Sequence, residues 1–256
     1  MARSQSTAAG WHRGPESPPG VVCCWVLAIV LLLLGACSAG AERQRSTSRP
    51  ASSKAGSEPA TALAGRIAFD NHQDVWTINA DGTDLTRITD SPGPDFDPSW
   101  SPDGTQIAFR SERSGEPEIW LMNADGSGQH RLTTGLSPAW SPDGSMIAFS
   151  GEGGLSLIDA HGSHRRTLPH TEGGEYPSWS PDGTSIAFNS NLSGDHVMYI
   201  ARTDGSKVVE LTRSGEGWQV AWSPDGRSIL FTSHRDHTDN YTDVYVMRPD
   251  APTSGG

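Results

Sequence analysis

The turn sequence Trp-Ser-Pro-Asp-Gly occurs four times in this chain, at residues 100–104, 140–144, 179–183 and 222–226. In each copy the Pro pre-sets the turn, the Asp can bond back to the backbone, and the Gly can adopt a positive φ. The run Ile-Ala-Phe follows each turn, with Ile-Leu-Phe in the last copy. A tight turn between two short apolar runs predicts a β-hairpin, repeated along the chain.

Each repeat continues with two further runs, for example residues 119–123 and 131–133, and the turn Trp residues are 40, 39 and 43 positions apart. Four strands in a period of about 40 residues predict an all-β protein, a β-propeller of about five blades over residues 64–250. The first unit (66–89) lacks its innermost Trp strand, and the last (219–248) lacks its outermost strand. The blades either close as a ring, which is the preferred arrangement, or form an open arc completed by a partner or second copy.

The repeat pattern PxWSPDGxxIAFxS followed by IWxMNADGxxxxRLT resembles the TolB-like family of propeller repeats over residues 66–248. This resemblance implies a propeller that recognises another protein in the bacterial cell envelope. The motif is specific for the fold and says little about function, because one fold hosts many functions.

Residues 1–36 have the pattern of an export signal, with Arg3 and Arg13 before the apolar run 21–34. The run ends in Leu-Gly-Ala-Cys, which resembles the bacterial lipobox and predicts a lipoprotein signal peptide with lipid on Cys37. A plain secretory signal and an uncleaved anchor are the alternatives. A flexible linker (37–63) and a short tail (251–256) complete the predicted domains. The expected location is the cell membrane or outer membrane, lipid-anchored and facing the periplasm or the exterior.

Acidic residues gather in the irregular links between the predicted strands, and the net charge is −11. This charge gives no support to a nucleic-acid role. The links should meet at one end of the propeller, where they could attract a cation or a basic protein patch; a solvated rim is the alternative. Three of the acids also fit strand gatekeeping, namely Asp74, Glu118 and Asp243. The predicted binding face comprises Asp74, Asp95, Asp97, Glu118, Glu175, Asp195, Trp218 and Asp243.

No catalytic residue is predicted, because the chain has no GxSxG motif and no Cys after Cys37. His234, Asp236 and His237 could ligate a metal, but their order matches no metal motif, so a solvated loop is favoured and no metal site is predicted. No cofactor is expected, with calcium as the one alternative.

The favoured function is therefore a membrane-tethered, extracytoplasmic interaction or scaffold module, and not an enzyme. Its partners would be another envelope protein with a basic patch and, through the lipid, the membrane. A ligand- or metal-binding sensor and a hydrolase or lyase of envelope polymers are the alternatives.

Overall fold

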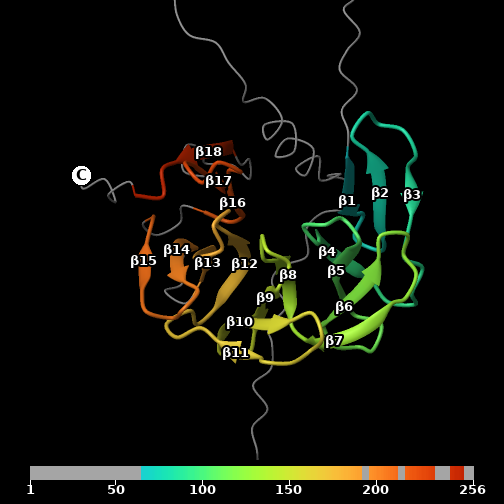
Figure 1. Cartoon of the computed structure of the whole chain (residues 1–256), viewed down its shortest axis with the longest axis horizontal. Helices are drawn as coiled ribbons and strands as arrows, with labels where there is room; N and C mark the ends of the chain where they lie inside the picture. The colour runs from blue at the N-terminus through green and yellow to red at the C-terminus, as the bar shows by residue number, and fades with distance from the viewer. Residues whose placement is uncertain (1–64, 192–195, 213–216, 234–242, 251–256) are drawn as a thin grey trace, which may run out of the picture.

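The computed structural model describes residues 65–191, 196–212, 217–233 and 243–250. The described residues form five antiparallel sheets arranged around a common axis (Figure 1). Within the described part of the chain, no helix is long and apolar enough to cross a membrane. The predicted signal peptide, Cys37, the linker and the tail lie outside the described residues.

The first three sheets follow one another along the chain. The first has three strands, and the second and third have four strands each. Their strands are β1 (Arg66–Asp70), β2 (Val75–Asn79) and β3 (Thr86–Arg87); β4 (Asp95–Trp100), β5 (Gln106–Ser111), β6 (Glu118–Asn123) and β7 (His130–Thr134); β8 (Leu136–Trp140), β9 (Met146–Gly151), β10 (Gly154–Asp159) and β11 (Arg166–Thr167).

The fourth sheet has four strands and the fifth has three. Their strands are β12 (Gly174–Trp179), β13 (Ser185–Ser190), β14 (Val197–Arg202) and β15 (Val208–Glu210); β16 (Val220–Trp222), β17 (Ile229–Ser233) and β18 (Asp243–Met247). Each sheet pairs its strands in sequence order, as expected for propeller blades. The prediction of five blades, the first without its innermost strand and the last without its outermost, is confirmed.

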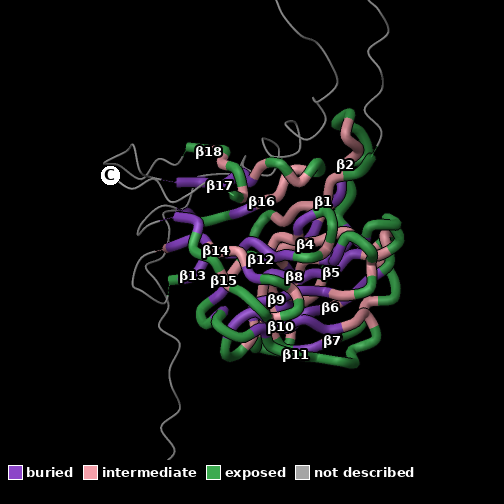
Figure 2. The backbone as a smooth tube through the Cα atoms, turned by 60° about the vertical axis from the view of Figure 1, so that its left-hand side comes forward, coloured by how far each residue is buried: buried purple, intermediate pink, exposed green. Residues whose placement is uncertain are grey.

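The core lies between the sheets, in four hydrophobic clusters that each join two consecutive sheets. Successive residues of a strand point to opposite faces, so both faces of the Ile-Ala-Phe run are buried. In the second sheet Ile107 and Phe109 pack toward the first sheet, and Ala108 packs toward the third. Figure 2 shows this burial along the middle strands, with exposure at the turns.

The Ala of each Ile-Ala-Phe run shares a cluster with the turn Trp of the following sheet. Ala108 is grouped with Trp140, and Ala148 with Trp179. The small side chain leaves room for the indole, which fills the wedge between two sheets as the sequence predicts. Trp140 is 8% exposed.

The arc is open between its two ends. Each of the four clusters joins neighbouring sheets, and among the described residues no fifth cluster joins the fifth sheet to the first. Figure 1 shows β1 and β16–β18 on opposite sides of this opening. The structure therefore adopts the open arc, and the closed ring preferred from the sequence is not formed by the described residues. Among the described residues, each terminal sheet has three strands where the middle sheets have four.

Candidate functional site

Three innermost strands share the same irregularity near their first residues. The register of β4, β8 and β12 against its partner shifts between Phe96 and Ser99, between Leu136 and Ala139, and between Glu175 and Ser178. The residue before the Pro in each shift has a positive φ, close to 50°: Asp97, Ser137 and Tyr176.

A positive φ is unusual for a residue that is not Gly, and helical conformations are further disfavoured before Pro. Strain of this kind costs about 1–3 kcal/mol per residue and persists where the surrounding structure enforces it. Bulges often re-aim a side chain near a functional site. Three copies at one level of three innermost strands therefore mark this end of the propeller as a candidate site. We call it the axial end, and the end with the Ser-Pro-Asp-Gly turns the turn end.

Asp97 lies at the centre of the axial end. Its Oδ2 accepts a hydrogen bond from Ser137 Oγ at 3.3 Å and lies 3.7 Å from Arg110 Nε. Its backbone N–H donates to Asp70 Oδ2 at 3.3 Å. These contacts join the first three sheets, which can meet only near the common axis.

The pKa of Asp97 is raised above its ordinary value, chiefly because burial disfavours the charged form. The negative charge of Asp70 adds to this effect, whereas the positive charge of Arg110 opposes it. An ionised carboxylate at this position therefore costs the folded state free energy.

The fourth sheet contributes Tyr176, which is 38% exposed. Burial raises the pKa of its hydroxyl, and the negative charges of Asp97 and Glu175 raise it further. Tyr176 therefore presents a neutral phenol, able to donate a hydrogen bond beside carboxylates.

Arg110 is the cation of the cluster. Its guanidinium lies 4.1 Å from the ring centre of Phe96, and its Nη1 lies 3.9 Å from Glu112 Oε1. Its Nε is buried with no hydrogen-bond acceptor among the described residues. The Arg110 guanidinium thus lies beside the carboxylates of Asp97 and Glu112, while Asp70 adds a further negative charge next to Asp97. The cluster therefore keeps an excess of negative charge.

Three of the predicted acids are committed to ion pairs within the sheets. Asp74 Oδ1 lies 2.8 Å from Arg87 Nη2, and the fully buried Asp95 lies 3.3 Å from Arg113 Nη2. Glu118 pairs with Arg131 and accepts a hydrogen bond from Trp120 Nε1. These ion pairs join a strand to its neighbour or to a link, so all three carboxylates are bonded within their own sheets.

The remaining predicted residues are spread over the fourth and fifth sheets. In the amide orientation that satisfies its neighbours, buried Asn189 donates to the carbonyl oxygens of Glu175 at 3.0 Å and Trp218 at 2.8 Å. Trp218 is 42% exposed, and its ring lies 3.6 Å from that of His196. Asp243 is exposed at the start of β18. Asp195, His234, Asp236 and His237 lie outside the described residues.

Asp70, Arg110, Ser137 and Tyr176 are not among the binding residues predicted from the sequence. A usable signal was present, because the residue before the Pro changes from Asp97 to Ser137 to Tyr176 within an otherwise constant Pro-x-Trp-Ser-Pro-Asp-Gly sequence. A variable position inside a constant scaffold is where binding residues are expected.

The turn end is built differently. In each of the four turns, the Asp Oδ1 accepts hydrogen bonds from the preceding Ser Oγ at 2.6 Å and from a backbone N–H at 3.0 Å; the four residues are Asp103, Asp143, Asp182 and Asp225. The Ser hydrogen bond is the largest cause of the lowered pKa of each of these carboxyls.

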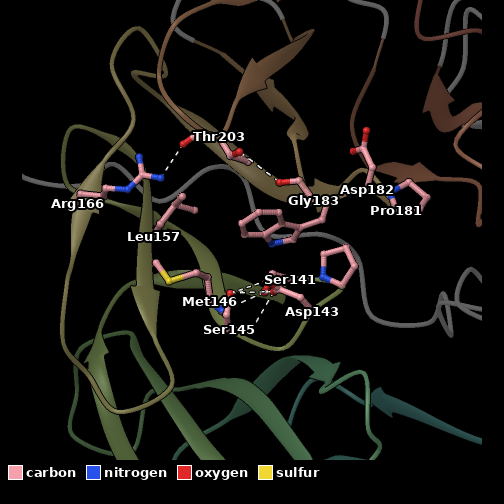
Figure 3. A pocket seen from close by; sticks show the side chains of 12 residues that line it. Ser141, Asp143, Ser145, Met146, Leu157, Arg166, Pro181, Asp182, Gly183 and Thr203 are labelled. Atoms are coloured by element: carbon pink, nitrogen blue, oxygen red, sulfur yellow. Dashed lines mark hydrogen bonds between the residues drawn. The ribbon is translucent and has the colours of Figure 1, made fainter.

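A pocket of about 370 Å³ opens at the turn end between the third and fourth sheets (Figure 3). Its walls include Leu157, Met146 and Trp179. Arg166 Nη2 donates to the carbonyl oxygen of Thr203 at 2.6 Å across the pocket, and Thr203 Oγ1 donates to that of Gly183. These polar groups bind one another, so we interpret the pocket as the open mouth of the inter-sheet wedge.

Among the described residues, no group of three or more His, Cys, Asp or Glu is placed to hold a metal ion. At the axial end, the side chains present suit charge attraction and hydrogen bonding with a partner.

The fold and its repeated turns define a β-propeller. The family model of the TolB beta propeller domain matches residues 28–137 and 134–253, which together make up most of the chain. The chain therefore belongs to the TolB β-propeller family.

Known proteins agree with this assignment. A 49-residue segment is 43% identical to the Protein TolB homolog of Chlorobium luteolum; it represents 19% of this chain and only 11% of that relative. The structure of putative TolB from Agrobacterium tumefaciens is 25% identical, with a TM-score of 0.62 over 72% of this chain and 73% of that one. TolB from Acinetobacter baumannii has a TM-score of 0.63 and 22% identity over 73% of this chain and 51% of its own.

Proposed function

We propose that this propeller is an extracytoplasmic interaction module, tethered to an envelope membrane through lipid on Cys37, whose axial end binds a basic surface of another envelope protein. Similarity to TolB proteins supports recognition in the envelope. We choose the axial end because of Asp97. Its carboxyl group lies at this end although burial raises its pKa and so disfavours the charged form.

Two kinds of side chain would contribute to binding at this surface. The carboxylates of Asp70, Asp97 and Glu112 attract a basic partner during diffusion, and Tyr176 and Trp218 offer the amphipathic rings that are enriched in protein interfaces. Exposed charges are screened beyond about 8 Å at physiological ionic strength, so the attraction should weaken as salt is added.

A photoreactive amino acid at position 176 tests the surface in the cells that produce the chain. The proposal expects a discrete crosslinked protein from position 176, but not from the matched position 143 at the turn end. Equal crosslinking from both positions would contradict the assignment.

The lipid tether is tested separately by Cys37→Ala. The expected result is that the chain leaves the membrane fraction after cell lysis, while its melting temperature stays the same. Retention of the variant in that fraction, with its signal segment shown by mass to have been removed, would rule out lipid on Cys37 as the anchor.

Calcium offers a test of the sensor alternative. Because paired carboxylates at the axial end hold an excess of negative charge, a calcium-binding propeller should melt at a higher temperature with calcium and revert with chelator. The interaction module proposed here should show no such shift, and no hydrolase or lyase activity on envelope polymers.

A further inference from the structure

Among the residues that the structure describes, the two terminal sheets each have one apolar face without the neighbouring sheet that covers the matching face elsewhere. Along the arc, every sheet has a leading face, toward the preceding sheet, and a trailing face, toward the next. Four junctions pair a trailing face with a leading face and bury both. The leading face of the first sheet and the trailing face of the fifth sheet lie at the opening of the arc (Figure 1).

The free trailing face is defined by Val244 and Val246, which are 36% and 63% exposed, beside Leu230, which is 7% exposed. Strand register aligns Val246 with Leu121 of the second sheet, because these residues pair with Leu230 and Ala108 respectively. Leu121 is 1% exposed in the junction with the third sheet, whereas Val246 is 63% exposed. The same pattern therefore buries an aliphatic side chain in one sheet and leaves it uncovered in the fifth.

The free leading face is defined by Ile67, Phe69, Trp76 and Ile78. By register, Ile67 and Phe69 match Ile107 and Phe109 of the second sheet, which are fully buried against the first sheet. Ile67 and Phe69 are only partly buried. None of the four residues of this face belongs to an inter-sheet cluster.

The two free faces are also complementary in volume. At the internal junctions, the preceding sheet presents Ala and the following sheet presents the turn Trp, as with Ala148 and Trp179. The fifth sheet instead has the larger Leu230, while the first sheet has no described innermost strand to supply a Trp. Leu230 would therefore fill part of the space that the turn Trp fills at the internal junctions. Well-packed cores tolerate exchanges that conserve volume.

We propose that the trailing face of one copy packs against the leading face of a second copy, in a head-to-tail association that continues the junction used four times within the chain. The second copy is the favoured occupant because it carries a face with the pattern that this junction requires. A contact between two different faces is heterologous, so a pair joined once keeps one free face of each kind.

The test measures molecular mass against concentration, by sedimentation equilibrium on the purified full chain. The native chain should show mass that rises with concentration. Val246→Asp should abolish the rise, because it places a charge in an apolar junction. Val209→Asp is the matched control: Val209 is also an exposed valine, 39% exposed, on the outer strand β15. It should associate as the native chain does.

Mixing two variants tests the head-to-tail geometry. Ile78→Asp removes the leading face and Val246→Asp removes the trailing face, so each variant alone should be monomeric. An equimolar mixture should form a one-to-one dimer, because one intact face of each kind remains. Circular dichroism and melting temperature verify that both variants fold.

Three results would overturn the proposal. The native chain could stay monomeric at every concentration, as it would if the arc closed on itself or another protein filled the opening. Val209→Asp could reduce association as much as Val246→Asp does. The mixture could stay monomeric although both variants are folded.

Discussion

The two ends of the innermost strands use the same residue type in opposite ways. At the turn end, hydrogen bonds from Ser141 and Ser145 lower the pKa of the Asp143 carboxyl. At the axial end, burial raises the pKa of the Asp97 carboxyl. A carboxylate that the fold stabilises is part of the architecture, whereas one that the fold destabilises suggests selection for another property. The repeated turn motif and the candidate site therefore occupy opposite ends of the same innermost strands.

The largest contrast should come from the Trp residues. Trp140→Ala empties the wedge between the second and third sheets and should lower the free energy of unfolding by about 3–5 kcal/mol. Trp218→Ala, at an exposed axial position, should change it by less than about 1 kcal/mol. Urea denaturation measures both values, and a similar loss for the two variants would break the comparison.

The turn carboxylate should contribute less. Asp143→Ala removes the acceptor of the hydrogen bonds from Ser141 Oγ and the Ser145 N–H. The expected loss is about 1–2 kcal/mol in the free energy of unfolding. Asp143→Asn, which keeps one acceptor oxygen, should lose less. Equal stability of Asp143→Ala and the native chain would show that the turn does not depend on this side chain.

Neutralising the carboxylate of Asp97 should raise the free energy of unfolding instead of lowering it. Asp97→Asn keeps a side chain that tolerates positive φ and removes a charge that burial disfavours. Stability should rise by about 1 kcal/mol, or by ~2–4 °C in melting temperature for a domain of this size. A fall in melting temperature would mean that the ion pair with Arg110 outweighs burial.

The smallest effect is the pH dependence of these differences. Above its raised pKa in the folded state, ionised Asp97 costs stability, and this cost disappears as the pH falls to the ordinary value of 3.8. The stability difference between Asp97→Asn and the native chain should therefore narrow as the pH falls through the raised pKa of Asp97 toward 3.8. The stabilisation from Asp143 is present above 3.8 and is lost only as the pH falls through its lowered pKa, so the gap for Asp143→Ala should narrow only below about pH 4. If both stability differences narrowed over the same pH range, the opposite pKa shifts of Asp97 and Asp143 would be contradicted.

The fold could be predicted in detail because the repeated sequence fixes the strand register. Each turn fixes a hairpin, and the alternation of Ile, Ala and Phe fixes which side chain faces which neighbouring sheet. The number of sheets and their incomplete ends followed from this pattern. Closure of the ring could not be predicted in this way. It depends on whether the first and last sheets meet, and no short sequence motif determines the distance between them.

The site was less predictable from the sequence. The acids of the links were identified, but their arginine partners lie on other strands or links, so Asp74, Asp95 and Glu118 could not be separated from Asp97. The bulge before each Pro was also missed, since positive φ at Ser137 or Tyr176 is set by the geometry of the innermost strand and not by the residue type.

Calorimetric titration with a lysine-rich peptide at low ionic strength, on the native chain, Asp97→Asn and Asp143→Asn, tests whether the axial end is the binding surface. The two variants carry the same charge change at opposite ends of the innermost strands. We expect the peptide to bind the native chain, to bind Asp97→Asn about three- to tenfold more weakly, and to bind Asp143→Asn as it binds the native chain. Equal weakening in both variants would contradict a binding surface at the axial end.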